Sequence, residues 1–265
     1  MFSAILLSCF CVATNVHPEE QAFLEASTFD PDSVLQMAPE ELQQRFNAFT
    51  PPPCEIEISL VRDQMVPTEV GDVPCRFYHP DPETPLPLLV WFHGGGWVLG
   101  TLDQADATCR LLAQRGHMAV LSVDYPLAPQ HPFPAAVTAC EAVSRWALTH
   151  SDELVVQPGV IAVGGDSAGG NLAAVTAATL GDRLTAQFLV YPALDALAQT
   201  ASRRDFARGY MLHADHMDWF YDSYLPDRSL WGDPRVSPLR AASQASLPRT
   251  VLMVAQVDVL RDEAV

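Results

Sequence analysis

The sequence predicts an α/β fold in which a mostly parallel, doubly wound sheet carries a helical cap. Short apolar runs alternate with longer helical segments from residue 54 onward, and this alternation is typical of parallel sheets. Two of the apolar runs end in glycine-rich turns, at 93–96 and at 164–170. A chain of 265 residues is long enough to form one such domain with a small accessory region.

The N-terminal part divides into an apolar leader and a helical segment. Residues 1–16 contain no basic residue, since the first is Arg45, and the leader is too short to span a bilayer. We interpret it as a non-native or mis-assigned start, with an export signal as the alternative. Apolar residues at helical spacing over 17–50 predict N-terminal cap helices, and the prolines at 51–53 predict a linker.

The core, expected over 51–265, alternates strands and helices. Alternating apolar and polar residues predict an edge hairpin with strands at 55–61 and 74–78. Apolar runs predict strands at 86–92, 118–123, 160–163, 186–191 and 250–257. Helical spacing predicts helices at 103–116, 133–150 and 167–180, and a cap insertion is expected at about 197–230.

The turn at 164–170 carries the pattern G-x-S-x-G, formed by Gly165, Ser167 and Gly169. A serine between a strand and a helix on so tight a turn takes a strained conformation that exposes its hydroxyl. Glycines on either side let neighbouring segments approach closely, and the helix N-terminus favours a developing anion. The alternative is a glycine-rich turn that merely contains a serine.

A second glycine run, His93-Gly94-Gly95-Gly96, follows the expected strand at 86–92. Consecutive glycines let backbone N–H groups point at a carbonyl oxygen that becomes negative during acyl transfer. A phosphate-binding loop is excluded, because that motif needs a lysine and the chain has none. We interpret His93 as a structural residue that orients this loop, not as a base.

A candidate acid, Asp258, follows the last expected strand. Catalytic groups in open α/β sheets collect at the carboxyl ends of the strands, so Ser167, Gly94 and Asp258 should converge there. Asp258 would then orient a catalytic imidazole. Its alternative role is to cap a helix ahead of Leu260, and Asp195 is a rival acid.

Composition narrows the class of function. The formal charge of −17 and the pI near 4.6 disfavour nucleic acid and anionic membranes as partners. The six cysteines show no metal-site spacing, and we expect reduced thiols in a cytoplasmic protein, with disulfides as the alternative. His213 and His216 suggest a metal site only weakly, because a solvated helix face explains them. We expect no metal and no cofactor.

Several stretches together resemble the hormone-sensitive-lipase-like branch of the α/β-hydrolases, the bacterial carboxylesterases of the HGGG and GDSAGG type. The matching stretches are HGGGWVLGTLD, DYPLAPQHPFPAA, GGDSAGGNLAA, DPRVSPL and VDVLRDE, and the resemblance extends over roughly 17–265. It implies the α/β-hydrolase fold, with Ser167 as nucleophile and Asp258 as triad acid. It also implies that the N–H groups of Gly94, Gly95 and Ala168 form the oxyanion hole. Short-to-medium acyl esters are the implied substrates, and a homodimer is an alternative to a monomer.

The sequence departs from that family at two places. The family's DYRLAPE reads DYPLAPQ here, with Pro126 and Gln130. Triad order in this fold is Ser, Asp, His, yet no residue of 259–265 is histidine. We therefore expect a chain truncated before the catalytic histidine and the last strand and helix, with compromised activity. The alternatives are a non-catalytic small-molecule-binding homologue, for which the plant gibberellin receptors are a precedent, and an inactive fragment.

Overall fold

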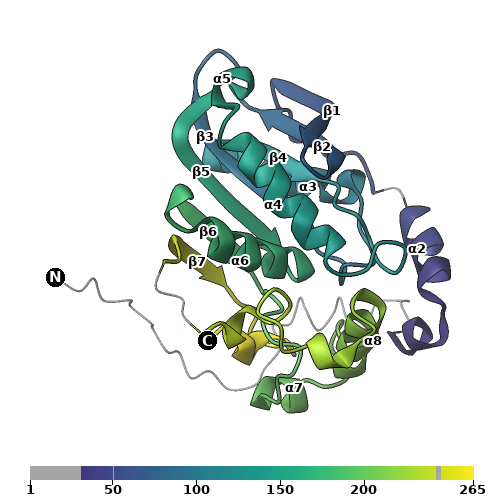
Figure 1. Ribbon diagram of the computed structural model, residues 1–265. Helices are drawn as coiled ribbons and strands as arrows, with labels where there is room; N and C mark the ends of the chain where they lie inside the picture. The colour runs from purple at the N-terminus through teal and green to yellow at the C-terminus, as the bar shows by residue number, and fades with distance from the viewer. Residues whose placement is uncertain (1–30, 50, 243–245) are drawn as a thin grey trace. The chain divides into compact units, whose positions relative to one another are not determined.

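A computed structural model describes residues 31–49, 51–242 and 246–265 (Figure 1). The leader expected at 1–16 and the first part of the expected N-terminal cap, 17–30, lie outside the described residues.

The core is a seven-stranded sheet with the order β1-β2-β4-β3-β5-β6-β7. The first two strands form an antiparallel hairpin, and β2 also pairs antiparallel with β4. All remaining neighbours are parallel, which confirms the predicted mostly parallel sheet. The strands are β1 (Leu60–Thr68), β2 (Gly71–His79), β3 (Leu86–Phe92), β4 (Ala119–Val123), β5 (Val156–Asp166), β6 (Ala186–Val190) and β7 (Arg249–Met253).

Helices cover both faces of this sheet, as a doubly wound topology requires. The long helices are α3 (Leu102–Gly116), α4 (Ala135–Ala147) and α6 (Ala168–Leu180), close to their predicted positions. Successive residues of β3 alternate between two hydrophobic clusters, one packed with α4 and α6 and the other with α3. Figure 1 shows α4 and α6 side by side on one face. The short helix α5 (Ser151–Leu154) precedes β5.

Several strand boundaries differ from the prediction, and β2 begins at Gly71 rather than at 74. The hairpin strand predicted at 55–61 is wrong, because β1 runs over Leu60–Thr68 and includes charged residues and Pro67. An edge strand tolerates both, since one side of its backbone needs no partner. Strand β5 begins at Val156, four residues before the predicted start at Val160. Strand β7 stops at Met253 rather than at 257, because its register partner on β6 is Val190, the last residue of that strand.

The cap regions lie next to the first glycine loop. The N-terminal part contributes η1 (Pro31–Gln36) and α2 (Pro39–Asn47), and the insertion contributes α7 (Ala201–Asp205), α8 (Ala214–Tyr224) and η3 (Arg228–Leu230). The Gln43 amide donates to the Val98 and Ala128 carbonyls at 2.7 and 2.9 Å. Tyr221 and Tyr224 of α8 pack on Trp97, with ring centroids 4.9 and 4.7 Å away. Three further 3-10 turns are η2 (Gly181–Arg183), η4 (Pro238–Arg240) and η5 (Arg261–Glu263).

The four cysteines in the described part of the chain are free thiols, and three of them are buried. Among the described helices, none has the length and apolar character that a membrane crossing needs.

Candidate active site

Ser167 lies between β5 and α6 in a conformation that L-residues rarely adopt, with φ 54° and ψ −117°. The positions on either side of Ser167 have room only for glycine. A methyl group at Gly169 would collide with the carbonyl oxygen of Phe92, and one at Gly165 would collide with Phe92 and Gly169. The G-x-S-x-G pattern therefore encodes close packing of the turn against β3. No hydrogen bond to the Ser167 hydroxyl is found within the described residues.

The start of α6 is held in place, and its first N–H groups, beginning with that of Ala168, have no acceptor within the helix. The Ser167 N–H donates to the Val190 carbonyl at 2.9 Å. The Asn171 amide donates to the Ala193 and Val236 carbonyls, each at 2.8 Å. Ala168 is the first residue of the helix, so its N–H has no acceptor within the helix. That N–H and the helix dipole favour negative charge beside Ser167.

The glycine loop after β3 has three successive carbonyls anchored by donors. The Tyr125 hydroxyl donates to the His93 carbonyl at 2.7 Å, and His93 Nδ1 donates to the Gly94 carbonyl at 2.8 Å. The Gly95 carbonyl accepts from the N–H groups of residues 98 and 99 at 3.1 and 2.8 Å. In a trans peptide the carbonyl and the N–H point in opposite directions. The anchors therefore also fix where the N–H groups point.

The N–H groups of this loop differ in their partners. The Gly94 N–H donates to Oδ1 of Asp166 at 3.1 Å, so the expected oxyanion donor Gly94 already has an acceptor. No acceptor in the described chain receives the N–H of Gly95 or of Gly96. Sequence reasoning missed Gly96, although its place as the third glycine of the run was a signal. Its positive φ of 60° turns the backbone there.

His93 has the geometry of an orienting residue. Its ring stacks on Tyr125 with centroids 4.4 Å apart. Burial lowers the pKa of His93 to about 4, so the imidazole is neutral at pH 7. A neutral ring with its Nδ1 proton directed at the Gly94 carbonyl holds the loop, and no hydrogen bond joins His93 to Ser167.

Asp258 follows β7 at the carboxyl ends of the strands, where Ser167 also lies, because β5, β6 and β7 are parallel neighbours. Its Oδ1 accepts the Leu260 N–H at 2.9 Å in a turn that precedes η5, whose own N-cap is Leu260. Burial raises the pKa of Asp258. Tyr191 follows β6, and its pKa is raised by burial and then by the charges of Asp166 and Asp258. Both carboxylates therefore lie near the Tyr191 ring.

The rival acid, Asp195, is bound on both oxygens by Arg240 at 2.6 and 2.9 Å. That ion pair leaves it poorly suited to orient an imidazole. Sequence reasoning missed Glu263, a buried residue whose Oε2 accepts the N–H groups of Leu194 and Asp195 at 2.8 and 3.0 Å. Glu263 thereby ties the segment after Asp258 to the loop after β6.

His213, Asp215 and His216 offer ligand atoms within 4.8 Å of one another. Arg208 forms an ion pair with Asp215 and already supplies positive charge there. The two imidazoles stack with planes 7° apart. Parallel rings cannot both direct an in-plane lone pair at one ion, as a zinc site requires. We assign no metal to this group.

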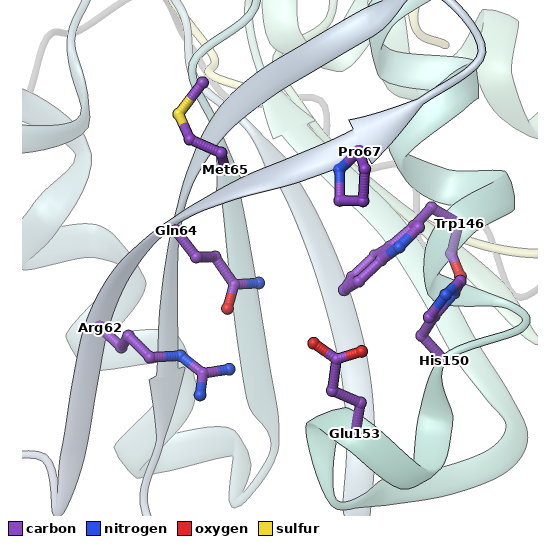
Figure 2. Close-up of a pocket in the computed structure, with 7 residues that line it drawn as sticks. All are labelled: Arg62, Gln64, Met65, Pro67, Trp146, His150 and Glu153. Carbon is purple, nitrogen blue, oxygen red and sulfur yellow. The ribbon is translucent and has the colours of Figure 1, made fainter.

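Two cavities found within the described residues are not lined by the nucleophile. One, of about 350 Å³, lies beside the edge strand β1 (Figure 2). Figure 2 shows the Arg62 and Glu153 side chains extending into it from opposite walls. Its lining residues are Arg62, Gln64, Met65, Pro67, Trp146, His150 and Glu153. The other, of about 420 Å³, lies between the cap insertion and the loop after β6. The converging polar groups, not a cavity, mark the candidate active site.

Comparison with known proteins decides the family. A profile described as "alpha/beta hydrolase fold" matches residues 89–265, a range that includes both glycine turns and Asp258. The chain belongs to the α/β-hydrolase family. An esterase of Pyrobaculum calidifontis superposes with a TM-score of 0.85 at 36% identity, over 94% of this chain and 83% of that one. Membership confirms the predicted fold.

Relatives in this family carry ester-hydrolase names. The carboxylic ester hydrolase LipN of Mycobacterium tuberculosis is 46% identical over 213 residues, which are 77% of this chain and 57% of LipN. An arylesterase of Saccharolobus solfataricus is 36% identical over 206 residues, which are 76% of this chain and 67% of that enzyme. The chain thus spans between about half and two thirds of these relatives.

Proposed function

We propose that this chain is a serine carboxylesterase that acts on small esters of short-to-medium acyl chains. The observation that carries the proposal is a strained serine turn beside three N–H groups without acceptors, those of Gly95, Gly96 and Ala168. The esterase and arylesterase names of the relatives support the same reaction. Gly96 replaces Gly94 as a proposed donor, because the Gly94 N–H is engaged by Asp166.

In this reaction the Ser167 hydroxyl attacks the ester carbonyl, and the carbonyl oxygen becomes an anion in the tetrahedral intermediate. Three N–H donors stabilise that charge. The intermediate collapses to an acyl-enzyme and releases the alcohol, and water then frees the acid. A histidine base would move the protons with Asp258 orienting it, as in other triads. Within the described residues no histidine is hydrogen bonded to Ser167.

The position of helix α8 favours a substrate with an apolar acyl group. Phe220 of α8 packs directly on Gly96, so a methyl group there would collide with the Phe220 ring. An aromatic wall beside an oxyanion donor favours an acyl chain over a charged group. The charge of −17 likewise disfavours anionic substrates. We propose small neutral esters, no cofactor and a cytoplasmic location, with a homodimer as an alternative to a monomer.

The decisive experiment compares three proteins on an aryl butyrate. They are the 265-residue chain, the same chain fused to a histidine-bearing C-terminal segment of the family, and the fused chain carrying Ser167→Ala. Because no described histidine is hydrogen bonded to Ser167, the first should retain only the activity due to the oxyanion hole and binding, roughly 10³–10⁴-fold above water. Extension should raise the rate by several orders of magnitude, and Ser167→Ala should remove that gain.

Two outcomes would change the proposal. Full activity from the 265-residue chain would show that one of its own histidines is the base. No gain on extension, together with tight ester binding, would favour the non-catalytic small-molecule-binding homologue.

A further inference from the structure

We propose that Asp166 is a positioning residue for the oxyanion hole. Its carboxylate fixes the peptide that enters the glycine loop and thereby aims the N–H groups of Gly95 and Gly96. The inference rests on the proposed function, because an oxyanion hole matters only to acyl transfer at Ser167.

The contact joins the two glycine turns directly. Asp166 is the last residue of β5, and its Oδ1 accepts the Gly94 N–H at 3.1 Å. A methyl group at Gly94 would collide with the other carboxylate oxygen. The carboxylate therefore lies against both the N–H and the Cα of Gly94. Only glycine at 94 leaves room for this carboxylate.

The peptide between residues 93 and 94 is held at both ends. The Tyr125 hydroxyl binds its carbonyl at 2.7 Å, and Asp166 binds its N–H. Glycine backbones have few steric restraints, so a run of three glycines needs anchors from outside to keep one conformation. Since Gly95 and Gly96 follow directly, a rotation of this peptide would redirect their N–H groups.

The contact is sensitive to the charge of Asp166. Burial raises the pKa of Asp166 to about 6. The titratable groups around it are His93, Cys109 of α3, Tyr125 and Tyr191. Burial lowers the pKa of His93 to about 4 and raises the pKa of the Cys109 thiol to about 12. Burial also raises the pKa of both tyrosines, so these four groups are neutral near pH 6. Asp258 also acts on the Tyr191 ring and burial raises its pKa, so the Asp166→Ala variant is what assigns the titration to Asp166.

The Gly94 amide can be observed alone by NMR. His93-Gly94 is the only His-Gly pair in the sequence, so carbonyl-¹³C histidine with ¹⁵N glycine labels one amide in a carbonyl-correlated spectrum. In the 265-residue protein we expect this amide to shift with a midpoint near pH 6. Asp166→Ala should abolish the shift and speed hydrogen exchange of this amide at least tenfold. Asp166→Asn should abolish the shift but keep exchange slow, because the Asn oxygen still accepts the N–H.

A matched control uses Asp124, which follows β4 and whose pKa burial also raises. It makes no hydrogen bond to the glycine loop, so Asp124→Ala should leave the Gly94 titration and exchange unchanged. A Gly94 amide that does not titrate, or one that titrates equally in Asp166→Ala, would overturn the inference.

A second experiment uses mass spectrometry to measure how fast an aryl phosphonate modifies Ser167. Asp166→Ala should slow modification at least tenfold, whereas Asp166→Asn should slow it by no more than about threefold at pH 8. Equal slowing by both variants would overturn the positioning role, because a shared acceptor oxygen could not then explain it. If the parent protein is not modified at all, the proposed function fails, and the Gly94 amide still decides whether Asp166 fixes the loop.

Discussion

The two halves of the candidate site are built on different parts of the sheet. The nucleophile and the oxyanion loop leave the central strands β5 and β3, where a single added methyl group would strike backbone. Asp258 follows β7, a strand at the edge of the described sheet whose five residues are all exposed. The first half is fixed by steric exclusion, and the second depends on a few hydrogen bonds, those of Glu263 and Asp258. Substitutions should therefore be far more damaging in the first half.

The largest effect is expected at Gly169. A methyl group there would collide with the backbone of Phe92 and His93, which cannot move without displacing β3. Gly169→Ala should lower the free energy of unfolding by on the order of 3 kcal/mol or prevent folding, as measured by denaturant titration. The control is Gly232→Ala, where the added methyl group has only ordinary contacts and the change should stay within about 0.5 kcal/mol. Equal tolerance at both positions would contradict a sterically fixed turn.

A smaller, pH-dependent effect is expected at Glu263. Burial raises the pKa of this carboxyl to about 7 from its ordinary 4.5, so the folded state disfavours the charged form. Its contribution to stability is therefore greatest below pH 4.5 and is lost as the pH rises through 7. Glu263→Gln keeps an acceptor for the Leu194 and Asp195 N–H groups, and should raise the melting temperature at pH 8 but not at pH 4.

Glu263→Ala is the matched comparison. It leaves two buried N–H groups unpaired and should lower stability at every pH by roughly 1–3 kcal/mol. Identical pH dependence in Glu263→Gln and the parent chain would show that Glu263 does not titrate in this range.

Asp166 offers the same test of pH-dependent stability in the half of the site built on β5 and β3. Burial raises its pKa to about 6 from 3.8, so its stabilising contribution is lost as the pH rises through 6. Asp166→Asn should stabilise the fold at pH 8 by on the order of 1–3 kcal/mol in denaturant titrations. A destabilised Asn variant at pH 8 would mean that the ionised carboxylate strengthens the fold.

The smallest effect on stability is expected on the edge strand itself. Val251 of β7 is 58% exposed, and Leu252 and Met253 beside it are also exposed, so the edge offers an apolar surface for pairing with other chains. Val251→Lys should change the unfolding free energy by less than about 0.5 kcal/mol and reduce self-association seen by light scattering. Met65→Lys is the control, because Met65 on the opposite edge is 57% exposed but lies on a strand that also carries Arg62 and Asp63. Equal relief by both variants would show that association is not specific to β7.

The comparison also explains what sequence patterns could predict. The buried strand at 86–92 and the helix at 167–180 were placed within one residue, because an uninterrupted apolar run and a glycine-bounded turn have few alternatives. The edge strands were displaced, since exposed positions in β1 and β7 carry polar and apolar residues alike. Hydrogen bonds across the sheet, such as Asp166 to Gly94 and Glu263 to Leu194, join residues far apart in the chain. No local pattern encodes those partners, so the sequence predicts neither the engagement of the Gly94 N–H nor the role of Glu263.

The most direct test of the central claim is covalent labelling of the parent chain with an aryl phosphonate, read by peptide mass spectrometry. The phosphonyl oxygen mimics the oxyanion, so a serine turn beside three N–H donors should react, although no described histidine is hydrogen bonded to Ser167. We expect one adduct, on the peptide containing Ser167, and none in Ser167→Ala. An adduct confined to another residue, or no adduct with excess reagent, would contradict the proposal that Ser167 is the nucleophile of an esterase.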